Sequence, residues 1–339
     1  MIVGHTRPIR YLEAVLQNGT LAHAYIFHGP EGVGKKTVAL ALAKSIFCKE
    51  KPERLGGCSP SPVLPGKTGE GTCEDCRLTD ELRHPDLALL AADTPLIAEE
   101  GRGIGIKNIR ELIRRLALSA WRGGRKVVLI DGADALSRDA QAALLKLVEE
   151  PDGKTVFFFI TASPDLLLPT IRSRGVAINF TEVGESELSP FVGTLPSMRQ
   201  RSLLALARGR PGVLMRLVAD KEFFEELRDR EGAYPKILET NLADQFDFSL
   251  RASRESDALE SFLGYLIRRK RSELHDALGA PGPERPFAAG AFLASILGRL
   301  SLVRSTNVNR RLILDGIFIE LALSSPAGQP VRGAGSVSL

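Results

Sequence analysis

A glycine-rich segment near the N-terminus constrains the fold of this chain more than any other feature. Residues 29–35 read Gly-Pro-Glu-Gly-Val-Gly-Lys and match the first seven positions of the phosphate-binding pattern G-x-x-x-x-G-K-[ST]. A short apolar run precedes the segment, and an Ala- and Leu-rich helical stretch follows it at 37–47. This order places backbone N–H groups and a helix N-terminus around a phosphate. The segment therefore predicts a P-loop site in an α/β domain.

The candidate nucleotide-binding residues in this segment are Gly29, Gly32, Gly34, Lys35, Lys36 and Thr37. Lys35 is expected to reach the β- and γ-phosphates. The eighth position normally holds a Ser or Thr whose hydroxyl binds Mg²⁺; here it is Lys36, and an ammonium cannot bind a cation. Thr37 lies about 100° further around the helix and is a poor substitute. A solvated side chain at the helix start is the alternative for Lys36.

A second strand, predicted at 126–131 (KVVLID), ends in a carboxylate. It is apolar without alternation, as expected of a parallel strand covered on both faces. Asp131 stands where a P-loop site organises Mg²⁺, but the next residue, Gly132, offers no base to orient a water molecule. Asp134 is assigned to the turn into the next helix. ATP or ADP with Mg²⁺ is therefore the candidate ligand. We expect the intrinsic ATPase activity to be weak or absent.

Strands and helices alternate along the first half of the chain, which indicates an open parallel sheet. Further strands are predicted at 155–161 and 175–180, and the pattern after residue 180 is almost entirely helical. A length of 339 residues suggests two or three domains. No apolar run is long enough to cross a bilayer, and the N-terminus lacks the pattern of a signal peptide. We expect a cytoplasmic protein with no membrane partner.

Four cysteines, Cys48, Cys58, Cys73 and Cys76, lie close together in the sequence. In a reducing compartment such a cluster is more often a metal site than a pair of disulfides. Four thiolates with a closing C-x₂-C pair suit tetrahedral Zn²⁺, and four protein ligands leave no open position for catalysis. We predict a structural zinc site. Unliganded thiols and disulfides are the alternatives, and the long separation of Cys58 from the C-x₂-C pair leaves its role open.

Several motifs in order resemble the bacterial AAA+ clamp-loader subunits of DNA polymerase III. They are HAYIFHGPEGVGKKT, HPDL, VVLIDGADAL, LLKLVEEP and LLPTIRSR, with NVNRRLILDGIFIEL near the C-terminus resembling that family's collar helix. The resemblance implies an α/β P-loop AAA+ domain with a parallel sheet, a small helical lid domain and an all-α C-terminal collar domain. The expected boundaries are 1–180 with a zinc module inserted at about 48–82, 181–221 for the lid, 222–323 for the collar, and 324–339 for a disordered tail.

Within this family, the departures of this chain favour the delta-prime type over the hydrolysing tau/gamma motor subunits. The motor subunits resemble GVGKT/S and DEA patterns, whereas this chain has GVGKK and DGA. Gly212, and not an arginine, also stands where the second-sensor arginine of the motor is expected. The resemblance implies a stator that supports ATP-dependent loading of the sliding clamp in replication, within a DNA-directed DNA polymerase (nucleotidyltransferase) holoenzyme. The implied partners are the other clamp-loader subunits of a hetero-pentamer, the sliding clamp and primer–template DNA.

Ser173-Arg174 resembles the family's SRC motif, whose arginine projects into the ATP site of a neighbouring subunit. An arginine supplied in trans stabilises charge on the transferring phosphoryl group. Gly175 replaces the motif's cysteine and leaves the guanidinium intact; an ordinary surface arginine is the alternative. Thr161 and Ser163 fall in the first-sensor region or are strand-end hydrogen bonders.

Two other functions remain open from the sequence. One is a hydrolysing tau/gamma-like motor subunit that uses Lys35, Thr37 and Asp131. The other is a zinc-containing DNA-binding module, because the helical segment 108–118 is basic. A solvated helix face is the alternative for those basic side chains.

Overall fold

The computed structural model describes residues 2–50, 55–58, 73–91, 104–117, 120, 124–149, 154–254, 256–278, 285–305 and 308–324. The chain divides into two compact units, Met1–Lys221 and Glu222–Leu339. Among the described helices, none combines the length and the apolar composition that a membrane crossing requires.

A five-stranded parallel sheet forms the centre of the first unit. Its strands are β1 (Ala24–His28), β2 (Leu87–Ala91), β3 (Lys126–Asp131), β4 (Thr155–Thr161) and β5 (Val176–Asn179). Their order across the sheet is β2-β3-β4-β1-β5, and every neighbouring pair is parallel. The P-loop strand β1 is therefore separated from β3 by one strand, β4.

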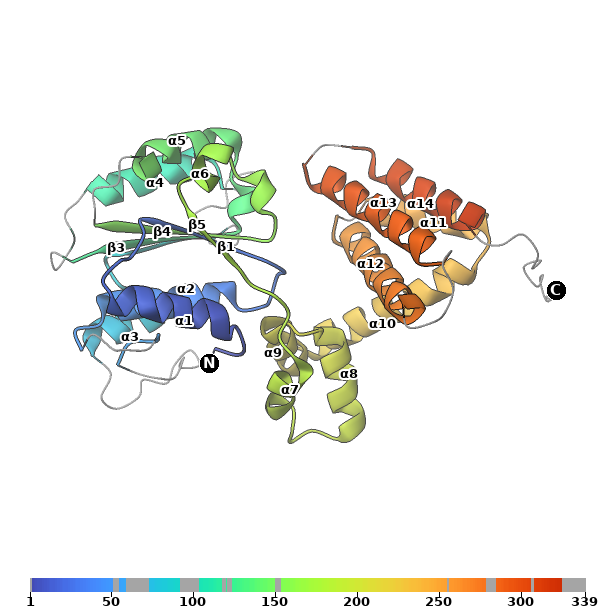
Figure 1. The fold of residues 1–339 in the computed structure, drawn as a ribbon, viewed down its shortest axis with the longest axis horizontal. Helices are drawn as coiled ribbons and strands as arrows, with labels where there is room; N and C mark the ends of the chain where they lie inside the picture. The colour runs from blue at the N-terminus through green and yellow to red at the C-terminus, as the bar shows by residue number, and fades with distance from the viewer. Residues whose placement is uncertain are drawn as a thin grey trace. The chain divides into compact units, whose positions relative to one another are not determined.

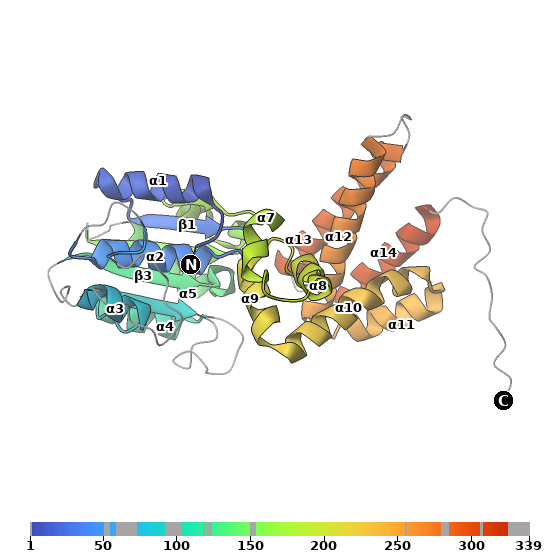
Figure 2. The ribbon, with the colours of Figure 1, turned by 90° about the horizontal axis from the view of Figure 1, so that it is seen from below.

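Helices cover both faces of this sheet (Figures 1 and 2). One face carries α1 (Thr6–Gln17) and α2 (Lys35–Phe47), with α3 (Glu74–Asp80) packed against α2. The other face carries α4 (Ile106–Ala117), α5 (Arg138–Glu149) and α6 (Pro169–Arg172). Two short 3₁₀ turns, Ala133–Ala135 and Pro164–Leu166, connect strands to helices at the edge of the sheet.

Residues of each strand alternate between two hydrophobic cores, one on each face of the sheet. In β1, Ile26 belongs to the core under α4 and α5, whereas Tyr25 and Phe27 belong to the core under α1 and α2. Phe158 of β4 stacks on Tyr25 with ring centroids 5.4 Å apart. Burial on both faces explains why these strands are continuously apolar in sequence.

The first unit ends in a small group of helices, α7 (Glu185–Leu188), α8 (Ser197–Ala207) and α9 (Pro211–Ala219), with a 3₁₀ turn at Ser189–Phe191. The turn between α8 and α9 needs a glycine, because Gly209 has a φ of +69° and an added Cβ would lie 2.6 Å from the carbonyl oxygen of Val183. Pro211 then starts α9, where its missing N–H is not needed.

The second unit is entirely helical in its described part. Its helices are α10 (Lys221–Glu239), α11 (Leu242–Ala252), α12 (Ser256–Leu278), α13 (Arg285–Ser305) and α14 (Arg310–Ser324). They bury an aromatic-rich core that includes Phe262 and Phe318, both fully buried. Helix α14 also carries three exposed apolar side chains at roughly helical spacing, Leu312, Ile319 and Leu323.

The predicted fold class is confirmed: a P-loop α/β domain with a parallel sheet is followed by helices alone. Sequence reasoning missed the edge strand β2, whose five residues are mostly half-buried; only its first residue, Leu87, belongs to a quoted motif, HPDL. It also missed α3 within the expected zinc insertion. The predicted disordered tail lies, apart from Ser324, outside the described residues, as does most of the insertion between Cys58 and Cys73.

Candidate functional site: a P-loop pocket and a cysteine cluster

The strand register brings the predicted nucleotide-site residues to one edge of the sheet. His28 at the end of β1 pairs with Thr161 of β4, and Asp131 at the end of β3 pairs with Ile160 of β4. Because all strands are parallel, their carboxyl ends meet there, which is where open α/β sheets bind ligands. The P-loop follows β1 directly at this edge.

The P-loop has the backbone conformation that its glycines predict. Gly29, Gly32 and Gly34 all have positive φ, at +139°, +76° and +109°, which other residues rarely adopt. Gly29 also lies against the residue that follows β5, because an added Cβ would come within 2.0 Å of the carbonyl oxygen of Phe180. Gly34 is the N-cap of α2 and, as a glycine, has no side chain that could accept a hydrogen bond from the first N–H groups of the helix.

Lys35 is folded back onto the loop that precedes it. Its Nζ donates to the carbonyl oxygens of Gly29, at 2.5 Å, and Pro30, at 2.8 Å, and the residue is only 7% exposed. Burial lowers the pKa of Lys35, while Glu31, Asp134 and Asp131 oppose that shift. Burial, helped by the nearby Lys35 ammonium, also lowers the pKa of His28.

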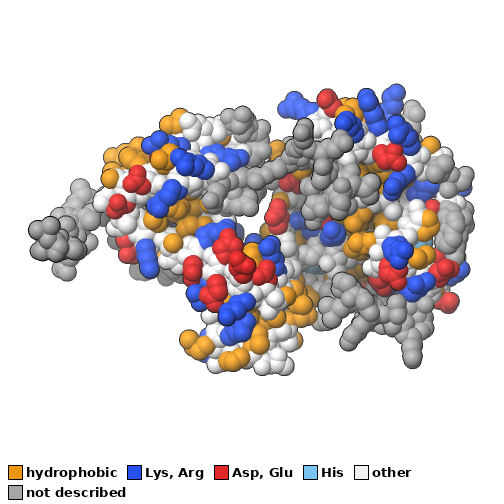
Figure 3. Space-filling model, turned by 180° about the vertical axis from the view of Figure 1, so that it is seen from behind, with side chains coloured by type: hydrophobic (Ala, Val, Ile, Leu, Met, Phe, Trp, Pro, Cys, Tyr) orange, Lys and Arg blue, Asp and Glu red, His pale blue; other side chains and the backbone are white. Residues whose placement is uncertain are grey.

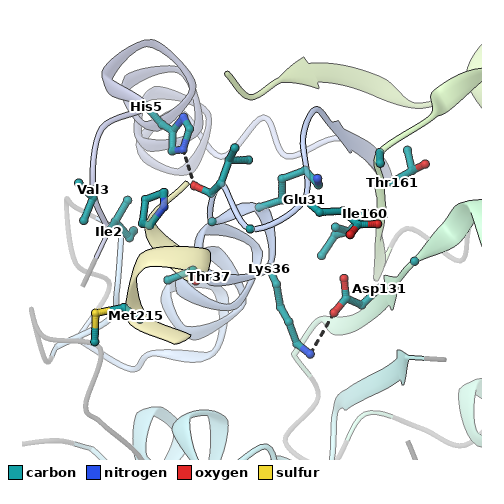
Figure 4. A pocket seen from close by; sticks show the side chains of 18 of the residues that line it. Ile2, Val3, His5, Glu31, Lys36, Thr37, Asp131, Ile160, Thr161 and Met215 are labelled. Carbon is teal, nitrogen blue, oxygen red and sulfur yellow. Dashed lines mark hydrogen bonds and ion pairs between the residues drawn. The ribbon is translucent and has the colours of Figure 1, made fainter. Parts of the chain in front are cut away.

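Lys36 makes the contact that most distinguishes this site. Its Nζ lies 3.0 Å from Oδ2 of Asp131, and both side chains remain partly exposed. Figure 4 shows Lys36 reaching from the start of α2 across the pocket to the end of β3. The two positions that hold Mg²⁺ in a hydrolysing P-loop site are thus joined directly by an ion pair. The residues present do not fit a magnesium ion.

A pocket of about 590 Å³ opens beside the P-loop. Its wall includes the phosphate-loop residues Glu31, Gly32, Val33, Gly34, Lys35, Lys36 and Thr37, the strand-end residues Asp131, Gly132, Ile160 and Thr161, and the apolar side chains Ile2, Val3, Pro211 and Met215. One end is therefore polar and glycine-lined, and the other is apolar. A phosphorylated ligand with a flat apolar part suits this division.

Helix α9 approaches the P-loop closely through two glycines. The N–H of Gly212 donates to the carbonyl oxygen of Gly32 at 2.8 Å. A Cβ on Gly212 would lie 3.0 Å from that same oxygen, and a Cβ on Gly32 would lie 2.7 Å from Cγ2 of Val213. A side chain at Gly212 would therefore require the P-loop backbone at Gly32 to shift slightly.

Of the other predicted site residues, some line the pocket and others do not. Thr161 lines the pocket, but its Oγ1 accepts from the N–H of Ser163 at 2.9 Å, and Ser163 is not among the pocket residues. Thr37 lies toward Met215 and not toward Asp131 (Figure 4). Asp134 is in the predicted turn and also lines the pocket. Sequence reasoning missed that second role, and its spacing from Asp131 was the only available signal.

The four cysteines come together although Cys58 is distant from the C-x₂-C pair in sequence. Their sulfur atoms all lie within 4.8 Å of one another, with Cys48 to Cys73 at 3.9 Å and Cys58 to Cys76 at 3.6 Å. Tetrahedral Zn²⁺ with bonds of about 2.3 Å separates sulfurs by roughly 3.8 Å, whereas a disulfide requires about 2.05 Å. This donor set could hold a metal ion and does not form disulfides.

Neighbouring contacts hold the cysteines in place. The hydroxyl of Ser45 accepts from the N–H groups of Gly56 and Gly57, at 2.9 and 3.2 Å, which fixes the turn before Cys58. An added Cβ on Gly57 would come within 2.4 Å of the sulfur of Cys76. The ring of His84 stacks on Phe47 with centroids 3.9 Å apart. The cluster is thus built onto the end of α2, the helix that begins at the P-loop.

Arg174 lies on the surface, two residues after the end of α6. Its guanidinium contacts Oε1 of Glu149 at 3.2 Å and donates to the carbonyl oxygen of Thr170 at 3.2 Å. The side chain is 39% exposed. Gly175 packs against β1, because an added Cβ would lie 2.8 Å from Ile26. A cysteine at this position would therefore require the Ile26 side chain to shift.

The basic segment predicted at 108–118 forms the exposed face of α4. Arg110, Arg114 and Arg115 are all exposed, and Glu111 pairs with Arg114 at 3.1 Å and with Arg115 at 3.7 Å. Figure 3 shows Lys and Arg side chains gathered over the part of the first unit that contains α4, α5 and α6.

Comparison with known proteins agrees with the resemblance seen in the motifs. Residues 4–184 match the family described as DNA polymerase III, delta subunit. The chain is 34% identical over 200 residues to the DNA polymerase III subunit delta' of Pseudomonas aeruginosa, covering 58% of this chain and 56% of that protein. It is 33% identical over 176 residues to the delta' subunit of Bacillus subtilis, covering 51% and 46%.

A gamma/tau relative also matches. The chain is 30% identical over 214 residues to the DNA polymerase III subunit gamma/tau of Mycobacterium bovis, covering 63% of this chain and 32% of that protein. The chain spans about half the length of the delta' relatives it matches. Because the family match covers more than half of its residues, the chain belongs to the DNA polymerase III delta subunit family.

Proposed function

We propose that this chain is a delta-prime-type clamp-loader subunit, a stator that supports ATP-dependent loading of a sliding clamp onto primed DNA. The observation that carries the proposal is the ion pair between Lys36 and Asp131. It joins the two positions that normally hold magnesium, while the phosphate-binding loop itself is retained. Gly132 adds no catalytic base. Such a site can hold phosphates but lacks the groups that hydrolysis uses. Family membership gives the context in which a subunit of this kind acts.

In this proposal residues 1–180 form the AAA+ domain, 181–221 the lid and 222–323 the collar that joins a hetero-pentamer with other clamp-loader subunits. The exposed side chains of Leu312, Ile319 and Leu323 on α14 support a packing role for the collar. The sliding clamp and primer–template DNA are then reached through the assembled complex.

Arg174 is the residue that we assign to the neighbouring ATP site. Its exposed guanidinium is held by Glu149 and by the Thr170 carbonyl, so it is presented at the surface in one orientation. An arginine that enters a phosphoryl-transfer site from outside stabilises the developing charge and accelerates the reaction strongly. The exchange of Glu149 for a phosphate oxygen would keep the guanidinium paired throughout.

The test is ATP turnover by the reconstituted complex carrying Arg174→Ala. We expect assembly to be unchanged and turnover to fall by roughly tenfold or more. Arg172→Ala is the matched control, since Arg172 lies two residues away, has the same 39% exposure and pairs with Asp165. Equal activity of the two variants would refute the role of Arg174. Robust hydrolysis by the isolated chain, abolished by Lys35→Ala, would instead identify a tau/gamma-like motor.

The cysteine cluster is proposed to hold a structural Zn²⁺ through Cys48, Cys58, Cys73 and Cys76. Sulfur separations near those of a tetrahedral site support it. The ion would tie the end of α2 to α3, because Cys48 follows the first helix and Cys76 lies in the second. Metal analysis of the purified chain is expected to give one zinc per chain, and Cys73→Ser is expected to lose it. Full zinc content in that variant would contradict the assignment.

A further inference from the structure

The pocket beside the P-loop is lined by more carboxylates than ammonium groups. Two ammonium groups, of Lys35 and Lys36, and three carboxylates, of Glu31, Asp131 and Asp134, line it. In a magnesium-dependent site the divalent ion offsets the carboxylate and the phosphates together. Here one of the three carboxylates is already paired with a side-chain cation of the protein itself.

We infer that the Lys36 ammonium takes the place of Mg²⁺, so that the pocket binds a nucleoside di- or triphosphate without a divalent cation. The ammonium sits at the first turn of α2, where the magnesium-binding hydroxyl normally stands, and 3.0 Å from the carboxylate of Asp131. It neutralises Asp131 and still offers two further N–H donors to a phosphate oxygen. The carboxylate in turn fixes the position of the ammonium.

The described residues that line this pocket offer magnesium no comparable place. Thr37, the nearest hydroxyl on α2, lies on the side of the helix toward Met215 and not toward Asp131 (Figure 4). A divalent ion at Asp131 would have to displace the Lys36 ammonium or lie against it, and like charges at such distances repel. Without the ammonium, Lys35 alone would face three carboxylates, which would repel a phosphate chain unless a divalent ion were added.

The inference rests on the phosphate site of the proposed function but not on assembly with partners. It is tested by isothermal titration of the full-length chain with ADP, once in excess EDTA and once in excess MgCl₂. The wild-type affinity is expected to agree within about twofold between the two media, because no step requires the divalent ion. Lys35→Ala should abolish binding in both media, which assigns the signal to this pocket.

Lys36→Thr restores the usual hydroxyl and is the decisive variant. In EDTA its affinity for ADP is expected to fall by roughly tenfold or more, as for the loss of one hydrogen bond between charged groups, and MgCl₂ should recover it. Lys36→Arg keeps the cation and should bind in EDTA, and Lys36→Gln serves if the threonine variant does not fold. Lys146→Thr, at an exposed position on α5, is the matched control and should behave as wild type.

Three results would overturn the inference: wild-type binding that needs MgCl₂, no binding of ADP in either medium, or undiminished binding by Lys36→Thr in EDTA. None of these results depends on Arg174, so the stator role is tested separately by ATP turnover of the reconstituted complex. Conversely, if Arg174→Ala left the turnover of the complex unchanged, the ADP titrations would still decide whether Lys36 replaces Mg²⁺ in this pocket.

Discussion

The ion pair between Lys44 and Asp80 links the nucleotide-site helix to the cysteine cluster. Lys44 lies in the last turn of α2 and is 3% exposed, and its Nζ donates to Oδ2 of Asp80 at 2.5 Å. Asp80 ends α3, the helix that contains Cys76. Replacing Asp80 by Asn removes the negative charge and leaves a buried ammonium with only a neutral acceptor.

The cost follows from the burial of the two partners. Removal of one partner from a buried ion pair costs about 3–5 kcal/mol, because the remaining charge stays uncompensated. The Asp80 side chain is 26% exposed, so water and the amide oxygen compensate in part, and we expect about 2–3 kcal/mol for Asp80→Asn. At roughly 2–4 °C per kcal/mol for a domain of this size, the melting temperature of the first unit should fall by about 5–10 °C.

Thermal unfolding followed by circular dichroism, with equal zinc content in every sample, measures this change. Glu81→Gln is the matched control, because Glu81 is the next residue and pairs with Arg77 at 3.4 Å in an exposed pair that is worth about 0.5 kcal/mol or less. Lys44→Met combined with Asp80→Asn should regain part of the loss, since no buried charge then remains. If Asp80→Asn and Glu81→Gln shift the melting temperature equally, the reasoning from burial is wrong.

Three further predictions concern a buried amide, a buried phenol and a close backbone contact. Gln141 donates to the carbonyl oxygens of Leu136 and Leu166 and accepts from the N–H of Leu168, so Gln141→Leu should cost about 3 kcal/mol in urea unfolding; a loss below 1 kcal/mol would contradict it. Burial raises the pKa of Tyr234 to about 12, above the unfolded value near 10. Its contribution to the second unit is therefore complete below pH 10 and falls by roughly 2–3 kcal/mol as the pH rises to 12, a dependence that denaturant titrations should find absent in Tyr234→Phe. Gly212→Ala places a Cβ 3.0 Å from the carbonyl oxygen of Gly32 and should weaken ADP binding in calorimetry, whereas Gly124→Ala, which meets nothing within 4 Å, should not.

The parts of the fold that were predictable have signals confined to a few consecutive residues. The apolar segments that became β1, β3 and β4 are buried on both faces, and this requires a continuous apolar sequence. Strand β2 has no such signal, because its Leu-Ala-Leu-Leu-Ala run is equally compatible with a helix. Its pairing with β3, from Leu87 opposite Val127 to Ala91 opposite Asp131, makes it a strand. Helix α3 similarly depends on its contacts with α2.

The sequence by itself determined that a phosphate loop would form, because the three positive-φ glycines and Lys35 are local requirements of that loop. It also predicted a nucleotide site without the residues for hydrolysis, since Lys36 and Gly132 could be read directly. The tertiary structure alone decided what replaces them. The ion pair of Lys36 with Asp131, the contact of Gly212 with Gly32 and the return of Cys58 to the cluster all join residues that are distant in sequence. Such contacts depend on how the sheet and its helices pack, and they cannot be predicted from the periodic pattern of residues along the chain.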